Sequence, residues 1–446
     1  MISSMMAGIS GLKVHQTRMD VIANNIANVN TAGYKASRVT FREIYSRTLT
    51  SATAPDPETG VGGTNPTQIG LGVGLNAITL NYTNGSIETT DNPLDVAIDG
   101  DGFFIAKTSP IGEFFFTIAG SFGVDKMGNL VTSDGAQIYG WQSYTETEEG
   151  YIYNRESQVE AINVYQDIHN GTKKILSPQP TSFVTFTGNL NLNNDPGIDG
   201  QIGIPISVYD SYGTEYTAQI VFCRNGDPTD PDYNANEWEY EIQDGKGGTL
   251  FDTIKGTVEF DSKEGNEGRI KSLKDENGDE VDDFSLQKTV AFEGGNKDTL
   301  DIKFNFGSLT QYSADTSAKV YSSNGYTSGE LVDYSIGEDG VITGVYSNGK
   351  QQPLAKIAMA VFENPQGLRK VGGSMYAATT NSGDFIRGIE PHTTAGSLVS
   401  NALELSNVDL STEFTDMIIT QRGFQANSKI INTSDELLQE LVNLKR

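Results

Sequence analysis

The sequence predicts a multidomain, mainly β protein in which nested antiparallel β domains are inserted between N- and C-terminal α-helices that pair in a coiled-coil-like domain. Three observations support this fold class. Both ends carry apolar residues at alternating spacings of four and three, which is typical of helices with one narrow apolar seam. The middle consists of short apolar runs separated by Gly, Asn and Asp turns. Finally, 446 residues exceed what one ordinary core holds.

The first helix is predicted over residues 3–29 and ends at Thr31-Ala32-Gly33, because glycine readily adopts the left-handed conformation that terminates helices. Its last turns contain several asparagines, although asparagine is a mediocre helix former. The apolar seam consists of Met5, Ile9, Leu12, Gln16, Met19, Ala23 and Ile26.

Strand patterns fill the region between the helices. In residues 85–107 and 334–362, apolar residues either alternate with polar ones or form short continuous runs between tight turns. This pattern is typical of antiparallel sandwiches and barrels. Residues 51–74 are rich in Gly, Pro, Thr and Ser, which favours an extended linker. If the terminal helices pair, each domain between them is an insertion into the one before. We expect four parts: a terminal helical domain (1–30 with 405–446), an extended linker region (31–72 with 388–404), an inner β domain (73–145 with 335–387) and one or more outer β domains (146–334).

The C-terminal helix has both a predicted start and a seam. Ser406 and Asp409 fit a capping box at N-cap and N3, and Leu405 and Leu410 fit its hydrophobic staple. Both seams include polar residues, so neither helix can bury itself in a large core, and each needs a second helix to pack against. That second helix is the other terminal helix, the same helix of a neighbouring subunit, or both. The C-terminal seam consists of Leu410, Phe414, Met417, Gln421, Phe424, Ser428, Ile431, Asp435, Leu438 and Val442.

Charge and composition restrict the classes of partner. The chain has 31 Lys+Arg against 58 Asp+Glu, a net charge of −27, which repels nucleic acid and anionic membranes. No run approaches the ~20 apolar residues of a membrane-spanning helix, and no segment has the pattern of a cleaved signal peptide. Cys223 is the single cysteine, so no disulfide can form within the chain. We expect no nucleic-acid partner and no membrane insertion.

The sequence offers few motifs for catalysis or metal binding. The three histidines lie far apart, and no nucleophile elbow, Walker loop or G-x-G-x-x-G helix start is present. Residues 275–283, DENGDEVDD, resemble a calcium loop, but the glycine is at position four and Leu286 stands where a bidentate glutamate belongs. A hairpin around Asn277-Gly278 is therefore favoured. We expect no catalytic residues, no cofactor and no metal.

Two stretches at opposite ends resemble the bacterial flagellar axial proteins, the family of rod, hook and hook-associated proteins. Residues 19–41, MDVIANNIANVNTAGYKASRVTF, are similar to the family's N-terminal motif, and residues 405–444 are similar to its C-terminal helix. The matching positions are Ala23, Asn24, Asn25, Ala27, Asn28, Asn30, Thr31, Gly33, Tyr34 and Lys35 at one end, and Gln421, Arg422, Phe424, Gln425, Ala426 and Asn427 at the other.

The middle of the chain resembles the hook members of this family. Chain length and the segment ISVYDSYGTEYTAQIVF, residues 206–222, favour a hook protein over a distal-rod or hook-associated protein. Residues 340–384 are similar to the return segment of hook proteins, whereas residues 225–330 match nothing that we can name. An alternative from another class is a secreted acidic β-adhesin or glycan-acting enzyme.

The resemblance implies a structural, non-enzymatic subunit that self-assembles into a curved, flexible tube. The terminal helices would pair in the inner tube, with the β domains stacked outward, and the whole tube would act as a universal joint that transmits motor torque to the filament. The implied partners are further copies of the chain in a helical homopolymer, the distal rod protein, the hook cap, the hook–filament junction protein and the flagellar export apparatus. The implied location is the extracellular hook on the basal body, reached by type III secretion export without a cleaved signal peptide.

The asparagines of the motif suggest a hypothesis about assembly. An amide both donates and accepts hydrogen bonds, so we expect some of Asn24, Asn25 and Asn28 to bond across contacts between subunits. Their weak helix propensity would also leave the helix frayed until assembly. The alternative is an ordinary helix that ends in a polar turn.

Overall fold

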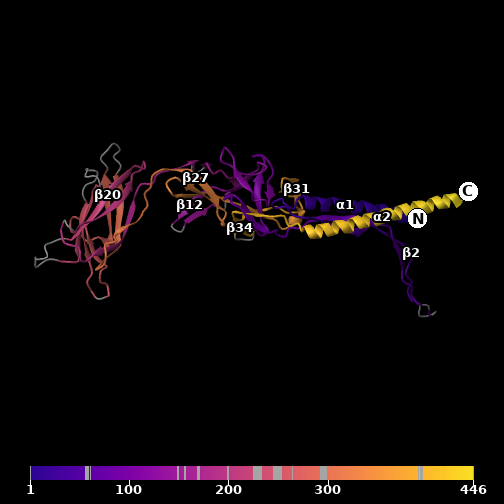
Figure 1. The fold of residues 1–446 in the computed structure, drawn as a ribbon, viewed down its shortest axis with the longest axis horizontal. Helices are drawn as coiled ribbons and strands as arrows, with labels where there is room; N and C mark the ends of the chain where they lie inside the picture. The colour runs from indigo at the N-terminus through magenta and orange to yellow at the C-terminus, as the bar shows by residue number, and fades with distance from the viewer. Residues whose placement is uncertain are drawn as a thin grey trace. The chain divides into compact units, whose positions relative to one another are not determined.

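A computed structural model describes residues 2–55, 60, 62–147, 150–154, 157–167, 171–197, 200–224, 234–244, 254–263, 265–291, 299–389, 391 and 395–444. The predicted fold class is confirmed: the chain is mainly β, with helices α1 (Ile2–Ala27) and α2 (Leu410–Leu444) at its ends. The two helices pack side by side (Figure 1). The chain divides into unit 1 (residues 1–173, 333–344 and 351–446) and unit 2 (residues 174–332 and 345–350). The finer division into four nested parts stays a prediction.

Unit 1 contains both helices and most of the short strands. Its strands are β1 (Ser37–Glu43), β2 (Ser46–Thr50), β3 (Thr67–Gly70), β4 (Val73–Leu80), β5 (Ile87–Thr89), β6 (Val96–Asp99), β7 (Phe103–Lys107), β8 (Phe115–Thr117), β9 (Phe122–Val124), β10 (Leu130–Thr132), β11 (Gln137–Trp141), β12 (Tyr144–Thr147), β13 (Gly150–Tyr153), β14 (Glu160–Ala161), β15 (Gln166–Asp167), β16 (Gly171–Thr172), β29 (Gln351–Ile357), β30 (Met359–Val361), β31 (Arg369–Gly372), β32 (Met375–Ala377), β33 (Ile386–Ile389), β34 (Ser397–Ser400) and β35 (Ala402–Glu404), with a 3-10 turn η3 (Pro365–Gly367). Strands β27 (Gly329–Ile336) and β28 (Val341–Tyr346) run from one unit into the other.

The core of unit 1 is aromatic. Strands β29, β11, β7, β8, β32 and β31 are neighbours in that order in its main sheet. Phe103, Phe116, Trp141, Phe362 and Tyr376 belong to one buried cluster, in which the Phe103 and Phe362 rings meet edge to face at 5.7 Å. Such pairs add stability beyond the area that they bury.

Outgoing and returning segments of the chain meet in unit 1. Strand β6 pairs antiparallel with β34, and β5 pairs antiparallel with β35. Residues near position 90 therefore lie beside residues near position 400, as nested insertion between paired helices requires.

Unit 2 consists of two sheets with a shared core. Its elements are β17 (Ile175–Leu176), β18 (Phe183–Asn191), β19 (Ile202–Tyr209), β20 (Glu215–Arg224), β21 (Glu237–Asp244), β22 (Ile254–Phe260), β23 (Ile270–Lys274), η2 (Asp282–Phe284), β24 (Ser285–Ala291), β25 (Thr299–Tyr312) and β26 (Lys319–Ser323). The five-stranded sheet β19-β20-β21-β22-β23 and the four-stranded sheet β24-β25-β18-β26 both supply residues to one hydrophobic cluster. The pair β18–β25 is parallel, contrary to the expected antiparallel pattern, because more than a hundred residues connect the two strands.

A two-stranded ribbon follows α1. Strand β1 pairs with β4, β2 pairs with β3, and a bridge joins Thr53 to Thr64 beyond them. Part of the segment 51–74, expected as an extended linker, is thus paired strand. At the base of the ribbon, the rings of His15 on α1 and Phe41 on β1 meet edge to face at 5.8 Å, and the backbone N–H of Val73 donates to Ser10 Oγ at 3.2 Å.

Candidate assembly site at the terminal helices

The terminal helices contact each other through small residues. Gly8 and Gly11 of α1 are buried, and a Cβ added at Gly11 would lie 2.8 Å from the amide of Asn427 on α2. A Cβ added at Gly423 of α2 would lie 2.6 Å from the ring of His15. Because helix separation depends on the side chains at the contact, these glycines let the helices approach closely. The contact face of α2 also includes buried Thr420 and Ser434.

The predicted seams lie largely beside this contact face. A strict seven-residue repeat drifts by roughly 20° per heptad around a straight helix, so the seam of α2 reaches the contact face only in its C-terminal half. On α1, Met5, Leu12, Met19 and Ile26 are half-buried, whereas Ile9, Gln16 and Ala23 are exposed. On α2, Met417, Ser428, Ile431 and Leu438 are half-buried, whereas Leu410, Phe414, Gln421, Phe424, Asp435 and Val442 are exposed. Whether the seams drive assembly stays a prediction.

Large apolar side chains of α2 are exposed in two stripes beside the contact face, and a further one, Ile418, is 58% exposed on the side opposite that face. The first stripe consists of Leu410, Phe414, Phe424 and Val442, which are 38%, 49%, 40% and 68% exposed. The second stripe consists of Ile419, Ile430 and Leu437, which are 54%, 43% and 56% exposed. At 3.6 residues per turn, each stripe lies roughly a quarter turn from the contact face. The sequence did not lead us to predict the second stripe, because only one seam with 4,3 spacing was considered. Apolar residues that recur along a second side of the helix would have indicated it.

Asn25 is a hydrogen-bonding centre inside the chain. It is 1% exposed, and its Nδ2 donates to the carbonyl of Ser37 and to Oε1 of Glu413, each at 2.9 Å. Its Oδ1 accepts from the backbone N–H of Ser37 at 3.0 Å and from the hydroxyl of Tyr34 at 3.2 Å. The amide of Asn25 is therefore fully used within the chain, and the bond of some of these asparagines across a contact between subunits stays a prediction. The hydrogen bonds of Asn25 join α1, β1 and α2.

The other asparagines of the motif also bond locally. Asn28 Nδ2 donates to both the carbonyl and the Oδ1 of Asn24 at 2.8 Å, and Thr31 Oγ1 donates to Asn28 Oδ1 at 3.2 Å. Tyr34 donates to Asn24 Oδ1 at 3.0 Å. Asn30 is exposed. These bonds form a polar turn after α1, and they match the alternative reading of an ordinary helix end.

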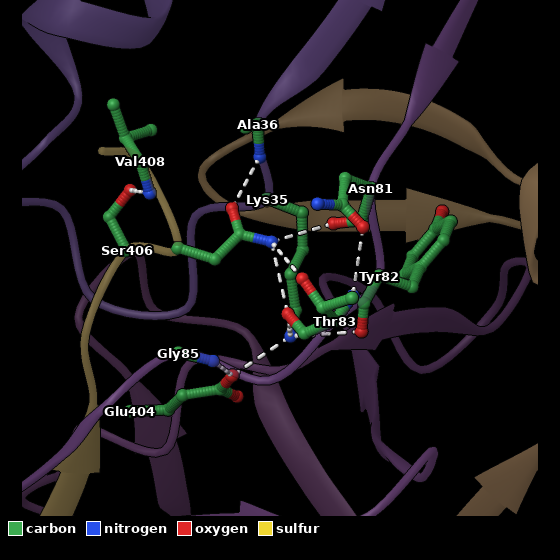
Figure 2. Close-up of polar contacts among 10 residues, drawn as sticks. Lys35, Ala36, Asn81, Tyr82, Thr83, Gly85, Glu404, Ser406 and Val408 are labelled. Carbon is green, nitrogen blue, oxygen red and sulfur yellow. Dashed lines mark hydrogen bonds and ion pairs between the residues drawn. The ribbon is translucent and has the colours of Figure 1, made fainter. Parts of the chain in front are cut away.

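Gly33 and Lys35 attach the end of the motif to the returning chain. Gly33 has a φ of +68°, and its N–H donates to the carbonyl of Glu404 at 2.8 Å. The side chains of Lys35 and Glu404 are 3% and 2% exposed, and they form an ion pair at 2.8 Å (Figure 2). Lys35 Nζ also donates to the carbonyl of Thr83 at 3.1 Å, and Glu404 Oε1 accepts from the N–H of Gly85 at 2.6 Å. The extra hydrogen bonds offset part of the desolvation of both charges.

Asn407 continues this junction. Its Oδ1 accepts from the N–H of Ala36 at 2.8 Å, and its Nδ2 donates to the carbonyls of Asn81 and Thr83 at 2.8 and 3.0 Å. Sequence reasoning did not single out Glu404 or Asn407, because no local pattern links them to residue 35. Together these contacts tie the chain leaving α1 to the chain entering α2.

The start of α2 differs from the predicted capping box. The prediction of Ser406 as N-cap is wrong, because the helix begins at Leu410 and Asp409 caps it. Asp409 Oδ1 accepts from the N–H of Ser411 at 2.8 Å, and Asp409 Oδ2 accepts from Thr412 Oγ1 at 2.9 Å. These hydrogen bonds hold the pKa of Asp409 below its ordinary value. Residue 406 belongs instead to the segment that holds Asn407 in the junction.

The remaining motif residues of α2 lie away from the junction. Arg422 and Gln425 are exposed, and their side chains are 3.5 Å apart. Asn427 is half-buried, faces Gly11, and donates from Nδ2 to the carbonyl of Gly423 at 2.9 Å. Only Asn427 of these three therefore contributes to the contact between the helices.

Glu413 is a titratable group at the contact between the helices. Arg18 and Asp416 pair beside it at 2.8 Å. Burial raises the pKa of Glu413 above its ordinary value, and the Asp416 carboxylate acts in the same direction, whereas the Asn25 hydrogen bond opposes the shift. A raised pKa means that the folded chain binds this proton more tightly than the unfolded chain does. The contribution of Glu413 to stability is therefore present below its ordinary pKa and is lost as pH rises through the raised value.

We expect Glu413→Gln to be at least as stable as the wild type at neutral pH, because glutamine keeps an acceptor for Asn25 without a half-buried charge. As pH falls below about 4.5, the ordinary value for Glu, the stabilities of the two proteins should converge. Thermal unfolding of the full chain across this pH range measures the effect, with exposed Glu440→Gln as the control. A variant that is less stable at neutral pH would contradict this assignment.

The acidic segment 275–283 forms a turn. Asp275 Oδ1 accepts from the N–H groups of Asn277 and Asp279 at 2.9 and 3.1 Å, and Gly278 has a φ of +83°. Within the part of the chain that the structure describes, no group of three or more His, Cys, Asp or Glu residues could hold a metal ion. Among the same residues, no helix is long and apolar enough to cross a membrane.

Four family models match the chain. They are described as flagella basal body rod protein (residues 5–35), flagellar hook protein FlgE/F/G D1 domain (97–173), flagellar basal body protein FlaE D2 domain (201–326) and flagellar basal body rod FlgEFG protein C-terminal (399–444). The D2 model covers most of the region 225–330 that resembled nothing in the sequence reading.

Similar proteins match over the whole chain. The chain is 37% identical to the flagellar hook protein FlgE of Borreliella burgdorferi and 36% identical to that of Treponema pallidum, with 100% of both chains covered in each case. The crystal structure of Helicobacter pylori flagellar hook protein FlgE2 matches with a TM-score of 0.47 at 17% identity, and the match covers 71% of this chain and 99% of that chain.

Proposed function

This chain belongs to the flagellar hook protein family, and we propose that it polymerises through the two apolar stripes of α2 into the wall of a curved, flexible tube. Membership over the full length makes it a structural subunit of the bacterial flagellar hook, a component of the motility apparatus. This favours the hook reading over a distal-rod or hook-associated protein, and over an adhesin or glycan-acting enzyme.

The position of the two stripes is the observation that supports polymerisation. Each stripe exposes large apolar side chains. The contact face of α2, which lies between the two stripes, is already covered by α1. Burial of apolar area contributes roughly 25 cal/mol per Å², so both stripes gain by contacting a neighbour. Stripes on two sides of one helix allow each copy to contact two others in a head-to-tail manner, which propagates as a ring or a helix.

We propose that the β domains supply flexibility. Unit 2 has its own core of Phe222, Trp238, Phe306 and their neighbours, so it can move as one body. As a curved tube rotates, the β domains of adjacent copies would slide past one another once per turn. Such sliding needs small, polar contacts, and the acidic surface of the chain is consistent with them. The tube would then transmit motor torque as a universal joint.

The specific partners and the route of export are proposals that follow from the family alone. The family places the chain in the hook and basal-body context. We propose contacts with the distal rod protein, the hook cap and the hook–filament junction protein. We also propose delivery by the flagellar export apparatus without signal-peptide cleavage, and no catalytic activity of the chain itself.

We expect salt to promote polymerisation, because copies with a net charge of −27 repel each other. Raising NaCl from about 10 mM to about 150 mM shortens the Debye length from roughly 30 Å to roughly 8 Å. The fraction of full chain that pellets as tubes, checked by electron microscopy, should increase over this range. Polymers that dissolve as salt rises from moderate to high would contradict the proposal.

A further inference from the structure

A cavity of about 170 Å³ is lined by the polar turn that follows α1 and by the β31–β32 hairpin (β31 in Figure 1). This volume greatly exceeds the roughly 10–15 Å³ that one water needs. Met375 and Tyr376 supply apolar walls, whereas Asn28, Thr31 and Ser374 supply polar ones. The cavity can therefore hold a small group that has both an apolar and a polar part.

Lys370 places an amine at this cavity. Its Nζ lies 4.4 Å from the centre of the Tyr34 ring and donates to the carbonyl of Lys35 at 3.3 Å. In the part of the chain that the structure describes, no carboxylate lies within ion-pair distance of this amine. Lys370 thus differs from Lys35 and Lys271, which pair with carboxylates at 2.8 and 2.6 Å.

The surroundings of Lys370 favour the neutral amine. Burial lowers the pKa of Lys370 below the ordinary value of 10.5. The face of the Tyr34 ring attracts the ammonium form, but less strongly than bulk water hydrates it. By contrast, the hydrogen bond to Glu259 raises the pKa of Lys271. At neutral pH a larger fraction of Lys370 is therefore in the neutral form, which is the nucleophile. The residue is also exposed, so a reagent can reach it.

We propose that Lys370 is a preferred acylation site of this chain, at which a small acyl group enters the cavity beside the amine. The co-reactant is an activated acyl donor of the acyl phosphate class. The neutral amine attacks the acyl carbon, and a C–N bond forms. The bond from that carbon to the phosphate oxygen breaks, phosphate leaves with the electron pair, and one amine proton passes to water. The amide product keeps one N–H for the carbonyl of Lys35. Acylation then takes the net charge of the chain from −27 to −28 without breaking an ion pair.

Partial acetylation of the full chain with acetyl phosphate tests this site. The remaining lysines are then labelled with deuterated acetic anhydride in concentrated urea, and mass spectrometry of the peptides gives the extent of acetylation at each lysine. At about pH 7.5, Lys370 should react at least about threefold faster than Lys319, an exposed lysine of unit 2, because one unit of pKa changes the neutral fraction about tenfold. Lys271 should react more slowly than either.

The pH dependence separates reactivity from simple accessibility. The ratio of the rates at Lys370 and Lys319 should fall toward one as the pH approaches 10.5, since ordinary lysines are then also neutral in large part. Acetylation in concentrated urea should show no preference for Lys370, because the cavity is lost on unfolding. A ratio near one in the folded chain at neutral pH, or a high ratio that does not change with pH, would overturn the proposal and leave the hook assignment standing.

Lys370→Gln mimics the acylated side chain and tests whether the fold tolerates it. Unit 1 of this variant should unfold at the wild-type urea concentration, as followed by Trp141 fluorescence in a Trp238→Phe background. Lys35→Gln leaves a buried carboxylate unpaired, so this matched control should unfold at a lower urea concentration. If Lys370→Gln unfolds as early as Lys35→Gln, the fold requires the charge of Lys370, and acylation of the folded chain is contradicted.

Discussion

Phe424→Asp is expected to abolish tube formation by the full chain while both β units stay folded. Phe424 lies in the first stripe of α2 and is 40% exposed in the single chain. A carboxylate there would be taken out of water in the polymer without a partner, which is strongly unfavourable. Sedimentation and electron microscopy of purified protein measure the loss.

Lys429→Asp is the matched control for this variant. Lys429 is exposed on the side of the same helix opposite the contact face, outside both stripes. The Lys429→Asp variant should still form tubes. Phe414→Asp changes another residue of the first stripe and should abolish tube formation, as Phe424→Asp does. If Phe424→Asp forms tubes at the wild-type concentration, the first stripe does not contribute to contacts between copies.

Lys35→Ala is expected to destabilise unit 1 by about 3–5 kcal/mol, because it leaves Glu404 buried without its cation. The Glu404 side chain is 2% exposed, so water cannot replace the lost partner in the folded chain. Urea unfolding followed by Trp141 fluorescence reports on unit 1, and a Trp238→Phe background removes the other tryptophan, which belongs to the core of unit 2. Unfolding of unit 2, followed by Trp238 in a Trp141→Phe background, should not change.

The double variant Lys35→Met/Glu404→Leu separates charge from packing. An apolar pair of similar volume should recover most of the stability, because breaking a buried pair costs more than replacing it. If Lys35→Ala unfolds at the wild-type urea concentration, the ion pair does not stabilise the junction.

The sequence was sufficient for the helices at both ends, the mainly β middle and the family, because these depend on local periodicity, turn residues and long motifs. It was insufficient for the face on which the helices meet. The 4,3 spacing pointed to residues such as Phe414 and Phe424, but Gly11 and Gly423 form the contact. Small residues have little apolar signal, so a hydrophobic pattern assigns the helix–helix contact to the larger neighbours.

The partners of polar residues were also beyond sequence reasoning. Asn25 bonds to Ser37 and Glu413, the second of which is 388 residues away, and Lys35 pairs with Glu404 across 369 residues. No spacing rule connects positions so distant, although nested pairing of the chain ends brings them together. The start of α2 was misplaced for a related reason: Ser406 and Asp409 both fit a cap, and the use of Asn407 in the junction keeps residues 405–408 out of the helix.

A cryo-electron microscopy reconstruction of tubes assembled from the full chain tests the central claim most directly. The account predicts that the first stripe of one α2 contacts one neighbouring copy and that the second stripe contacts another, with α1 of the same chain packed between them through Gly11 and Gly423. Tubes in which both stripes of α2 face an open channel, with the contacts between copies made by the β units alone, would contradict it.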